Sequence, residues 1–125
     1  MRIRHDAARN LLRLHLRREL PIGAPRPAQA AIDIGTGGRL LGLELLADAT
    51  LAAPWLAPSG DPLAPDYDSA GGSLYVPISA DEGGPNVRTA LAEVSLAVGR
   101  DGALLAIDLP RRGHGYEISY PSGNR

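Results

Sequence analysis

The stretch Leu12-Arg13-Leu14-His15-Leu16-Arg17 decides the fold, because apolar and basic residues alternate strictly along it. A period of two places the leucines on one face of a β-strand and the basic side chains on the other. The segments Ala-Ala-Ile-Asp-Ile at 30–34 and Leu-Gly-Leu-Glu-Leu at 41–45 alternate in the same way around the glycine-rich stretch 35–39. This arrangement predicts a β-hairpin whose turn depends on glycine.

The second half of the chain repeats the order of the first. Asp6 and Leu12 recur 62 positions later as Asp68 and Leu74, and the segment 38–45 recurs 64 positions later as 102–109. Two additional residues in the middle loop of the second copy account for the difference between the shifts. The sequence therefore predicts an internal duplication, in which each unit holds four strands. The expected strands are 2–5, 11–17, 29–34 and 40–46 in the first unit, and 65–67, 73–79, 91–98 and 103–109 in the second.

One all-β domain over residues 1–125 follows from this repeat, with a first unit at 1–46 and a second at 65–109. A four-stranded antiparallel unit of this size buries too little surface to be stable alone. We therefore expect the two repeated units to pack their apolar faces together as a pseudo-two-fold sandwich or flattened barrel.

The linker 47–64 and the tail 110–125 complete the chain. Prolines and a glycine limit any helix in the linker to about 48–53, with Asp48 as its N-cap. In the tail, a turn leads into an alternating segment, 116–120, which predicts a ninth strand. The linker's large apolar side chains are expected to seal one open end of the sheets: Leu51, Trp55 and Leu56.

Composition excludes several classes of function. The 125 residues include no cysteine, which rules out disulfides, thiolate nucleophiles and cysteine-ligated metals. No apolar run has the length of a signal peptide or a membrane span, so we expect a cytoplasmic protein that does not contact membranes. The net charge of −1 argues against a nucleic-acid binder. Nothing in the sequence indicates a cofactor or a metal.

The charge is unevenly distributed along the chain. All 13 basic residues are arginines, and eight of them lie in residues 1–46 against four acids. Residues 47–110 hold two arginines against nine acids. The first unit is therefore basic and the second acidic, which favours attraction between them.

The second unit carries a recognisable set of short motifs. Tyr67-Asp68 is followed by Leu74-Tyr75-Val76, then by Asp101-Gly102 and by Leu105-Ala106-Ile107-Asp108-Leu109. This order resembles the small bacterial family called domain of unknown function 2283, and the first unit matches it less closely through His5-Asp6, Leu12-Arg13 and the segment 42–45. The resemblance implies a compact β unit and no established activity or catalytic residue. Small families of this kind sometimes occur beside toxin-like partners in bacterial genomes, so the resemblance also implies a partner-binding role as one expectation.

A basic stripe is the main candidate for a binding site. If the first hairpin has a four-residue loop at 7–10, Arg4 faces Arg13 and Arg2 faces His15, with every apolar residue on the opposite side. Like charges directly opposite each other are destabilising, so something should offset them. An anionic ligand, a nucleic-acid backbone or an acidic partner could do so, and so could solvent or the neighbouring Asp33 and Glu44. The stripe consists of Arg2, Arg4, Arg13, His15 and Arg17.

The remaining candidates have structural interpretations. The stretch 35–38 lacks the Lys-Ser/Thr ending of a phosphate loop and is expected to be a turn. His5 is expected on the inner face as a core residue, and Asp6 and Asp68 should accept backbone N–H bonds in equivalent turns. A carboxylate pair from Glu44 and Asp108 is disfavoured, because both fall on outer faces of separate units.

Residues 111–115 have no counterpart in the repeat, which makes the segment the easiest place to add new chemistry. Its candidate residues are Arg111, Arg112 and His114. The sequence thus favours a non-catalytic binding or assembly module for a protein partner or an anionic ligand. The alternatives are a small hydrolase-like enzyme using His114 with a nearby carboxylate, and a homodimer joined through edge strands.

Overall fold

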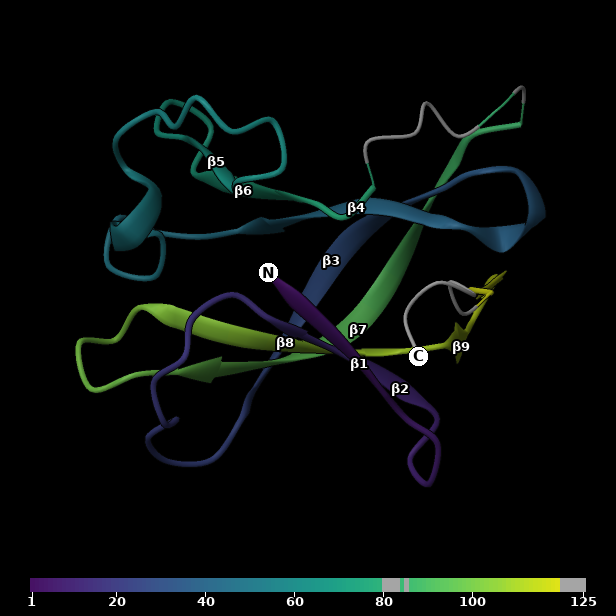
Figure 1. Ribbon diagram of the computed structural model, residues 1–125, viewed down its shortest axis with the longest axis horizontal. Helices are drawn as coiled ribbons and strands as arrows, with labels where there is room; N and C mark the ends of the chain where they lie inside the picture. Colours follow the sequence, from purple (N-terminus) through teal and green to yellow (C-terminus); the bar gives the residue numbers. More distant parts are fainter. Residues whose placement is uncertain (80–83, 85, 120–125) are drawn as a thin grey trace.

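The computed structural model describes residues 1–79, 84 and 86–119, and its regular structure is almost entirely β (Figure 1). Two single-turn 3-10 helices, η1 (Thr36–Gly38) and η2 (Ala53–Trp55), interrupt the strands. Within the described residues, no helix is long and apolar enough to cross a membrane. The strands are β1 (Arg2–Asp6), β2 (Leu11–His15), β3 (Arg26–Ile34), β4 (Leu40–Leu46), β5 (Asp66–Asp68), β6 (Ser73–Pro77), β7 (Arg88–Val98), β8 (Leu104–Pro110), β9 (Arg112–Gly113) and β10 (Tyr116–Glu117).

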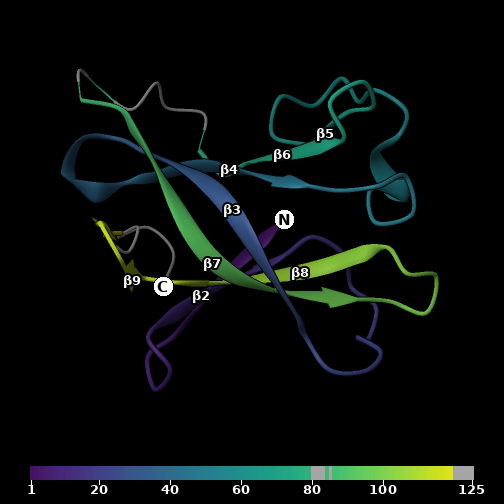
Figure 2. The same cartoon turned by 180° about the vertical axis from the view of Figure 1, so that it is seen from behind.

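Eight of these strands form one antiparallel sheet in the order β1-β2-β8-β7-β3-β4-β6-β5. The sheet curls into a half-barrel, with the β4–β6–β5 side above the β1–β2–β8 side in Figures 1 and 2. The predicted all-β antiparallel class is confirmed. The two units do not form separate sheets, however, because the first hairpin of each unit pairs with the second hairpin of the other. The long strands β3 and β7 pair at the centre and join the two halves of the sheet, which are β1-β2-β8-β7 and β3-β4-β6-β5.

The strand order reads the same from either edge when equivalent strands of the two units are exchanged. Backbone hydrogen bonds repeat with it: the amides of Leu16 and Arg17 donate to one carbonyl, and so do the amides 62 positions later. The bulge between Asp33 and Ile34 recurs 64 positions later, between Ala97 and Val98. The halves therefore share one topology, and their common origin by duplication remains a prediction.

The linker and the tail occupy equivalent places. The linker crosses to the second unit, where the Leu104 amide donates to the Leu51 carbonyl at 2.9 Å. The tail crosses to the first unit, where the Ser119 amide donates to the Gly38 carbonyl at 2.9 Å. Leu51 and Ile118 are both buried, so each segment closes one end of the half-barrel. The tail, which has no sequence counterpart, thus has a structural one.

The predicted seal of the linker is partly wrong. Leu51 joins the core and Trp55 packs against it, but Leu56 is 52% exposed, because the chain turns away from the sheet after η2. Asp48 caps the predicted short turn by accepting the Leu51 amide at 2.8 Å. In the tail, β10 is shorter than the predicted strand 116–120, and Tyr120 lies outside the described residues.

The core lies on the inner face of the curl, where the apolar residues of the alternating strands meet. The first hairpin has the predicted register, with Arg4 opposite Arg13 and Arg2 opposite His15. His5 lies opposite Leu12 of the core face, as predicted. Asp6 accepts the Arg9 amide, and Asp68 accepts the amides of Ala70 and Gly71, so both turn aspartates are confirmed. The period-two alternation therefore places the basic stripe on the outer face.

Candidate functional site

The basic stripe continues across the sheet onto strands of the other unit. Arg13 stands opposite Asp108 on β8, and Asp108 stands opposite Ser95 on β7. In the neighbouring row, His15 stands opposite Ala106, which stands opposite Ala97. The small side chains of Ser95, Ala97 and Ala106 leave space above this part of the sheet.

The Arg13–Asp108 pair offsets part of the repulsion between the like charges of the basic stripe. Arg13 Nε and Nη2 donate to the two carboxylate oxygens of Asp108, each at 2.6 Å. Asp108 is only 8% exposed, and its hydrogen bonds raise the pKa of Arg13. Such two-point pairing is the strongest geometry available to a guanidinium. Arg13 is therefore committed to an intramolecular partner and is not free to hold a ligand.

Arg17 is committed in the same way. Its Nη2 lies 2.7 Å from Glu19 and 3.1 Å from Asp101. Hydrogen bonding to Asp101 is the main cause that raises the pKa of Arg17. This pair ties the segment that follows β2 to the turn before β8, and so fixes the loop 18–25 over the sheet. The Ile22 amide adds a second anchor by donating to the Val98 carbonyl at 2.8 Å.

A cavity of about 870 Å³, which we call the Arg cavity, lies between that loop and the outer face of the sheet. Four of the predicted stripe residues line it, namely Arg2, Arg13, His15 and Arg17, whereas Arg4 does not. Its floor includes the small residues Ser95, Ala97 and Ala106, and its wall includes Leu20, Pro21 and Pro25. Sequence alternation thus predicted four of the basic residues that line the cavity, but not the loop residues that form its wall.

Two arginines of the Arg cavity lack a carboxylate partner. Arg2 and Arg18 are exposed, and none of the described acidic groups lies within ion-pair distance of either. Glu19 and Asp108, the acids that line the cavity, already pair with Arg17 and Arg13. The rim therefore carries uncompensated positive charge. Arg18 was not predicted, because nothing in its sequence alternation shows that the loop folds back over the sheet.

His15 stands at the floor of the Arg cavity as a neutral side chain. Burial is the largest cause that lowers its pKa, and the charges of nearby guanidiniums act in the same direction, against a smaller opposing effect of Asp108. Its Nε2 is buried and has no hydrogen-bond partner among the described residues. His15 therefore adds no positive charge to the cavity near neutral pH. The guanidiniums concerned are those of Arg2, Arg13 and Arg4.

The equivalent place in the other half is filled. Tyr75 stands where Arg13 stands, and it lies over Gly42, whose missing Cβ makes room for the tyrosine hydroxyl. The Tyr75 hydroxyl donates to Asp33 at 3.3 Å, and Thr89 donates to the same carboxylate at 3.0 Å. The Asp33 side chain is thus engaged by residues of the second unit, on β6 and β7, and not by the stripe. The two halves therefore differ at this position: one has a cavity beside Arg13, and the other has the Tyr75 side chain packed over Gly42.

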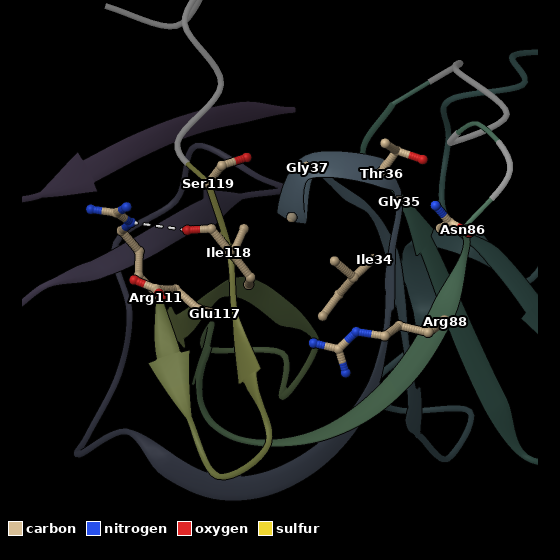
Figure 3. Close-up of a pocket in the computed structure, with 11 residues that line it drawn as sticks. Ile34, Gly35, Thr36, Gly37, Asn86, Arg88, Arg111, Glu117, Ile118 and Ser119 are labelled. Atoms are coloured by element: carbon tan, nitrogen blue, oxygen red, sulfur yellow. Dashed lines mark hydrogen bonds between the residues drawn. The ribbon is translucent and has the colours of Figure 1, made fainter.

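A second cavity, of about 590 Å³, lies beside η1, and we call it the turn hollow (Figure 3). The predicted turn at 35–38 is confirmed: it joins β3 to β4, with Gly37 and Gly38 at positive φ. Arg111, one of the tail candidates, lines the hollow and donates to the Ile118 carbonyl at 3.3 Å. Sequence reasoning missed Arg88 and Asn86, which enter this site from the start of β7 and the residues before it.

The other tail candidates do not converge on a catalytic arrangement. Arg112 pairs with Glu117 at 2.6 Å, which lowers the pKa of Glu117. His114 is exposed at the tip of the β9–β10 turn and lines neither the Arg cavity nor the turn hollow. Glu44 is exposed on β4, and Asp108 is buried on β8 against Arg13. Among the described residues, no group of three His, Asp or Glu side chains could hold a metal ion.

Comparisons with protein-family models, curated proteins and solved structures found no match to this chain.

Proposed function

We propose that the chain is a cytoplasmic, non-catalytic binding module that takes a small anionic ligand in the Arg cavity. The observation that carries the proposal is the charge of Arg2 and Arg18, which no described carboxylate pairs, at the rim of an 870 Å³ cavity whose lining acids are already engaged. Small-molecule sites are typically concave and carry a few charged groups at fixed positions. The Arg cavity has this form, whereas a protein partner would dock more readily on a flat surface. The resemblance of the repeat to domain of unknown function 2283 supports a compact β scaffold for this role.

The lining specifies the chemistry of the ligand. Ala97 and Ala106 on the floor and Leu20, Pro21 and Pro25 on the wall offer apolar contact. The two guanidiniums at the rim offer charge-assisted hydrogen bonds to a phosphate or carboxylate group. The expected ligand therefore has an anionic head and an apolar body.

Titration of the ¹⁵N-labelled protein with phenyl phosphate tests the proposal by NMR. Shifts are expected at the amides of Ser95, Ala97 and Ala106, with much weaker effects from benzyl alcohol, which lacks the charge. The double substitution Arg2→Glu with Arg18→Glu should abolish these shifts, because it reverses both unpaired charges and spares the paired ones.

A charge-matched control separates the site from overall charge. Arg26→Glu with Arg100→Glu alters two exposed arginines outside the Arg cavity. This control should bind phenyl phosphate like the original chain. Loss of binding in both double variants would show that general electrostatic attraction accounts for the effect, and unchanged binding in both would remove the Arg cavity as the site.

A further inference from the structure

The turn hollow lies apart from the Arg cavity and contains an arginine with unused donors. Arg88 Nη1 donates to the Gly115 carbonyl at 3.0 Å, which fixes the guanidinium in place. Figure 3 shows this guanidinium extending from β7 across the hollow toward Ile118, whereas Asn86 and Thr36 lie at the edge of the hollow, beyond Ile34. None of the described carboxylates lies within ion-pair distance of Arg88. From this arrangement we propose that the turn hollow binds the carboxylate of a small aliphatic acid through Arg88, with Asn86 as a second donor at its edge.

The equivalent cavity of the other half supplies an internal comparison. It measures about 900 Å³ and lies beside the Gly102 turn, under the linker. Four of the residues that line this cavity are equivalent, at an offset of 64 positions, to residues that line the turn hollow. Of these four, the two that are polar in the turn hollow have apolar equivalents here. Asn86, Arg88, Ile34 and Gly38 correspond to Ile22, Ala24, Val98 and Gly102.

The fold therefore does not require a guanidinium or a carboxamide at these two positions, although Arg26 and Asp48 line the opposite cavity elsewhere. Ile34 and Gly38 keep their type in the opposite half as Val98 and Gly102, which shape the end of the sheet. Arg88 and Asn86 differ in type from Ala24 and Ile22, and the contact with the Gly115 carbonyl uses only Nη1 of Arg88 among the described residues. Its remaining donors, with the carboxamide of Asn86, are groups that a carboxylate accepts well.

The rest of the lining determines which anion fits. Glu117 is already paired with Arg112, so Arg88 and Arg111 leave the lining of the hollow positively charged, and the site attracts an anion. Ile34 and Ile118 are buried and present apolar atoms to the floor. A carboxylate attached to a short branched hydrocarbon satisfies both conditions.

Titration with isobutyrate, followed by ¹⁵N NMR, tests this inference. Shifts are expected at the amides of Gly37, Gly38 and Ile118, and not at Ala97 or Ala106 of the Arg cavity. Isobutyramide, which has the same shape without the charge, and inorganic phosphate should both bind more weakly. Arg88→Leu should weaken isobutyrate binding by about tenfold to a hundredfold, because a charge-assisted pair is lost.

Arg100→Leu is the matched control, since it removes an exposed arginine from the equivalent turn of the other half. Its affinity for isobutyrate should equal that of the original chain. Asn86→Ala provides a second measurement, with a smaller loss expected from a neutral donor. Equal affinity of Arg88→Leu and the original chain, or stronger binding of phosphate than of isobutyrate, overturns the inference. Because the two sites report through different amides, either proposal can fail without the other.

Discussion

Removing Arg13 and removing Asp108 should lower the free energy of unfolding by different amounts, because the two side chains are buried to different extents. The side chain of Asp108 is 10% exposed, whereas that of Arg13 is 38% exposed. Arg13→Met leaves a buried carboxylate without its two donors, and Asp108→Asn leaves a guanidinium that can turn to solvent. The first substitution should therefore cost more than the second, and the double substitution should cost less than Arg13→Met alone.

The magnitudes follow from burial. Removing one partner of a fully buried pair costs about 3 to 5 kcal/mol, and exposed pairs contribute about 0 to 1 kcal/mol. Arg9 Nη2 lies 3.9 Å from Asp108 and can replace part of the lost charge. We expect a loss of about 2 to 3 kcal/mol for Arg13→Met and about 1 kcal/mol for Asp108→Asn, intermediate between those limits.

Urea unfolding followed by the fluorescence of Trp55, the single tryptophan, measures these losses. With a slope of about 1 to 3 kcal/mol per molar for a small domain, the midpoint of Arg13→Met should fall by about 1 to 2 M. Equal losses in the two single variants, or a coupling energy below about 0.5 kcal/mol in the double-mutant cycle, would refute the reasoning. The pair would then be a screened surface contact that does not hold β2 to β8.

Three further perturbations test other parts of the structure. Gly42→Ala should destabilise the fold by about 1 to 3 kcal/mol in thermal unfolding, since the added Cβ would meet the Tyr75 ring, and combining it with Tyr75→Ala should not add the two losses. Leu51→Ala should cost about 2 to 4 kcal/mol if the linker truly seals the core, and a loss near zero would contradict that role. His15 has a lowered pKa, so the stability it contributes is complete above its ordinary pKa of 6.5 and declines as the pH falls toward the folded-state pKa. Unfolding free energies measured from pH 7 to pH 4 should accordingly fall less steeply in His15→Gln, and parallel curves would contradict the assignment.

Local alternation predicted which residues share a face, and the structure agrees in the first hairpin, where Arg4 faces Arg13. A one-residue slip would move every leucine to solvent, so the pattern excludes it, and the four-residue loop at 7–10 then sets the register. Alternation could not show that β2 ends at His15, because that end depends on Leu16 and Arg17 sharing the carbonyl of Leu105 from the other unit. It also could not place Arg18 or Arg88, whose roles depend on how a loop and a strand start lie over the sheet.

The amino-acid sequence by itself determined the all-β class, the positions of the strands, the basic outer face and the turn at 35–38. These properties depend on period-two alternation and on glycine, which act within a few residues. Tertiary structure alone decided that the hairpins of the two units interleave in one curled sheet. It therefore also decided that Arg13 binds Asp108, 95 residues away, and that Arg2 and Arg18 meet no carboxylate of the described part of the chain at a cavity. The physical reason is that alternation fixes the direction of a side chain, whereas its neighbour depends on which strand hydrogen-bonds alongside.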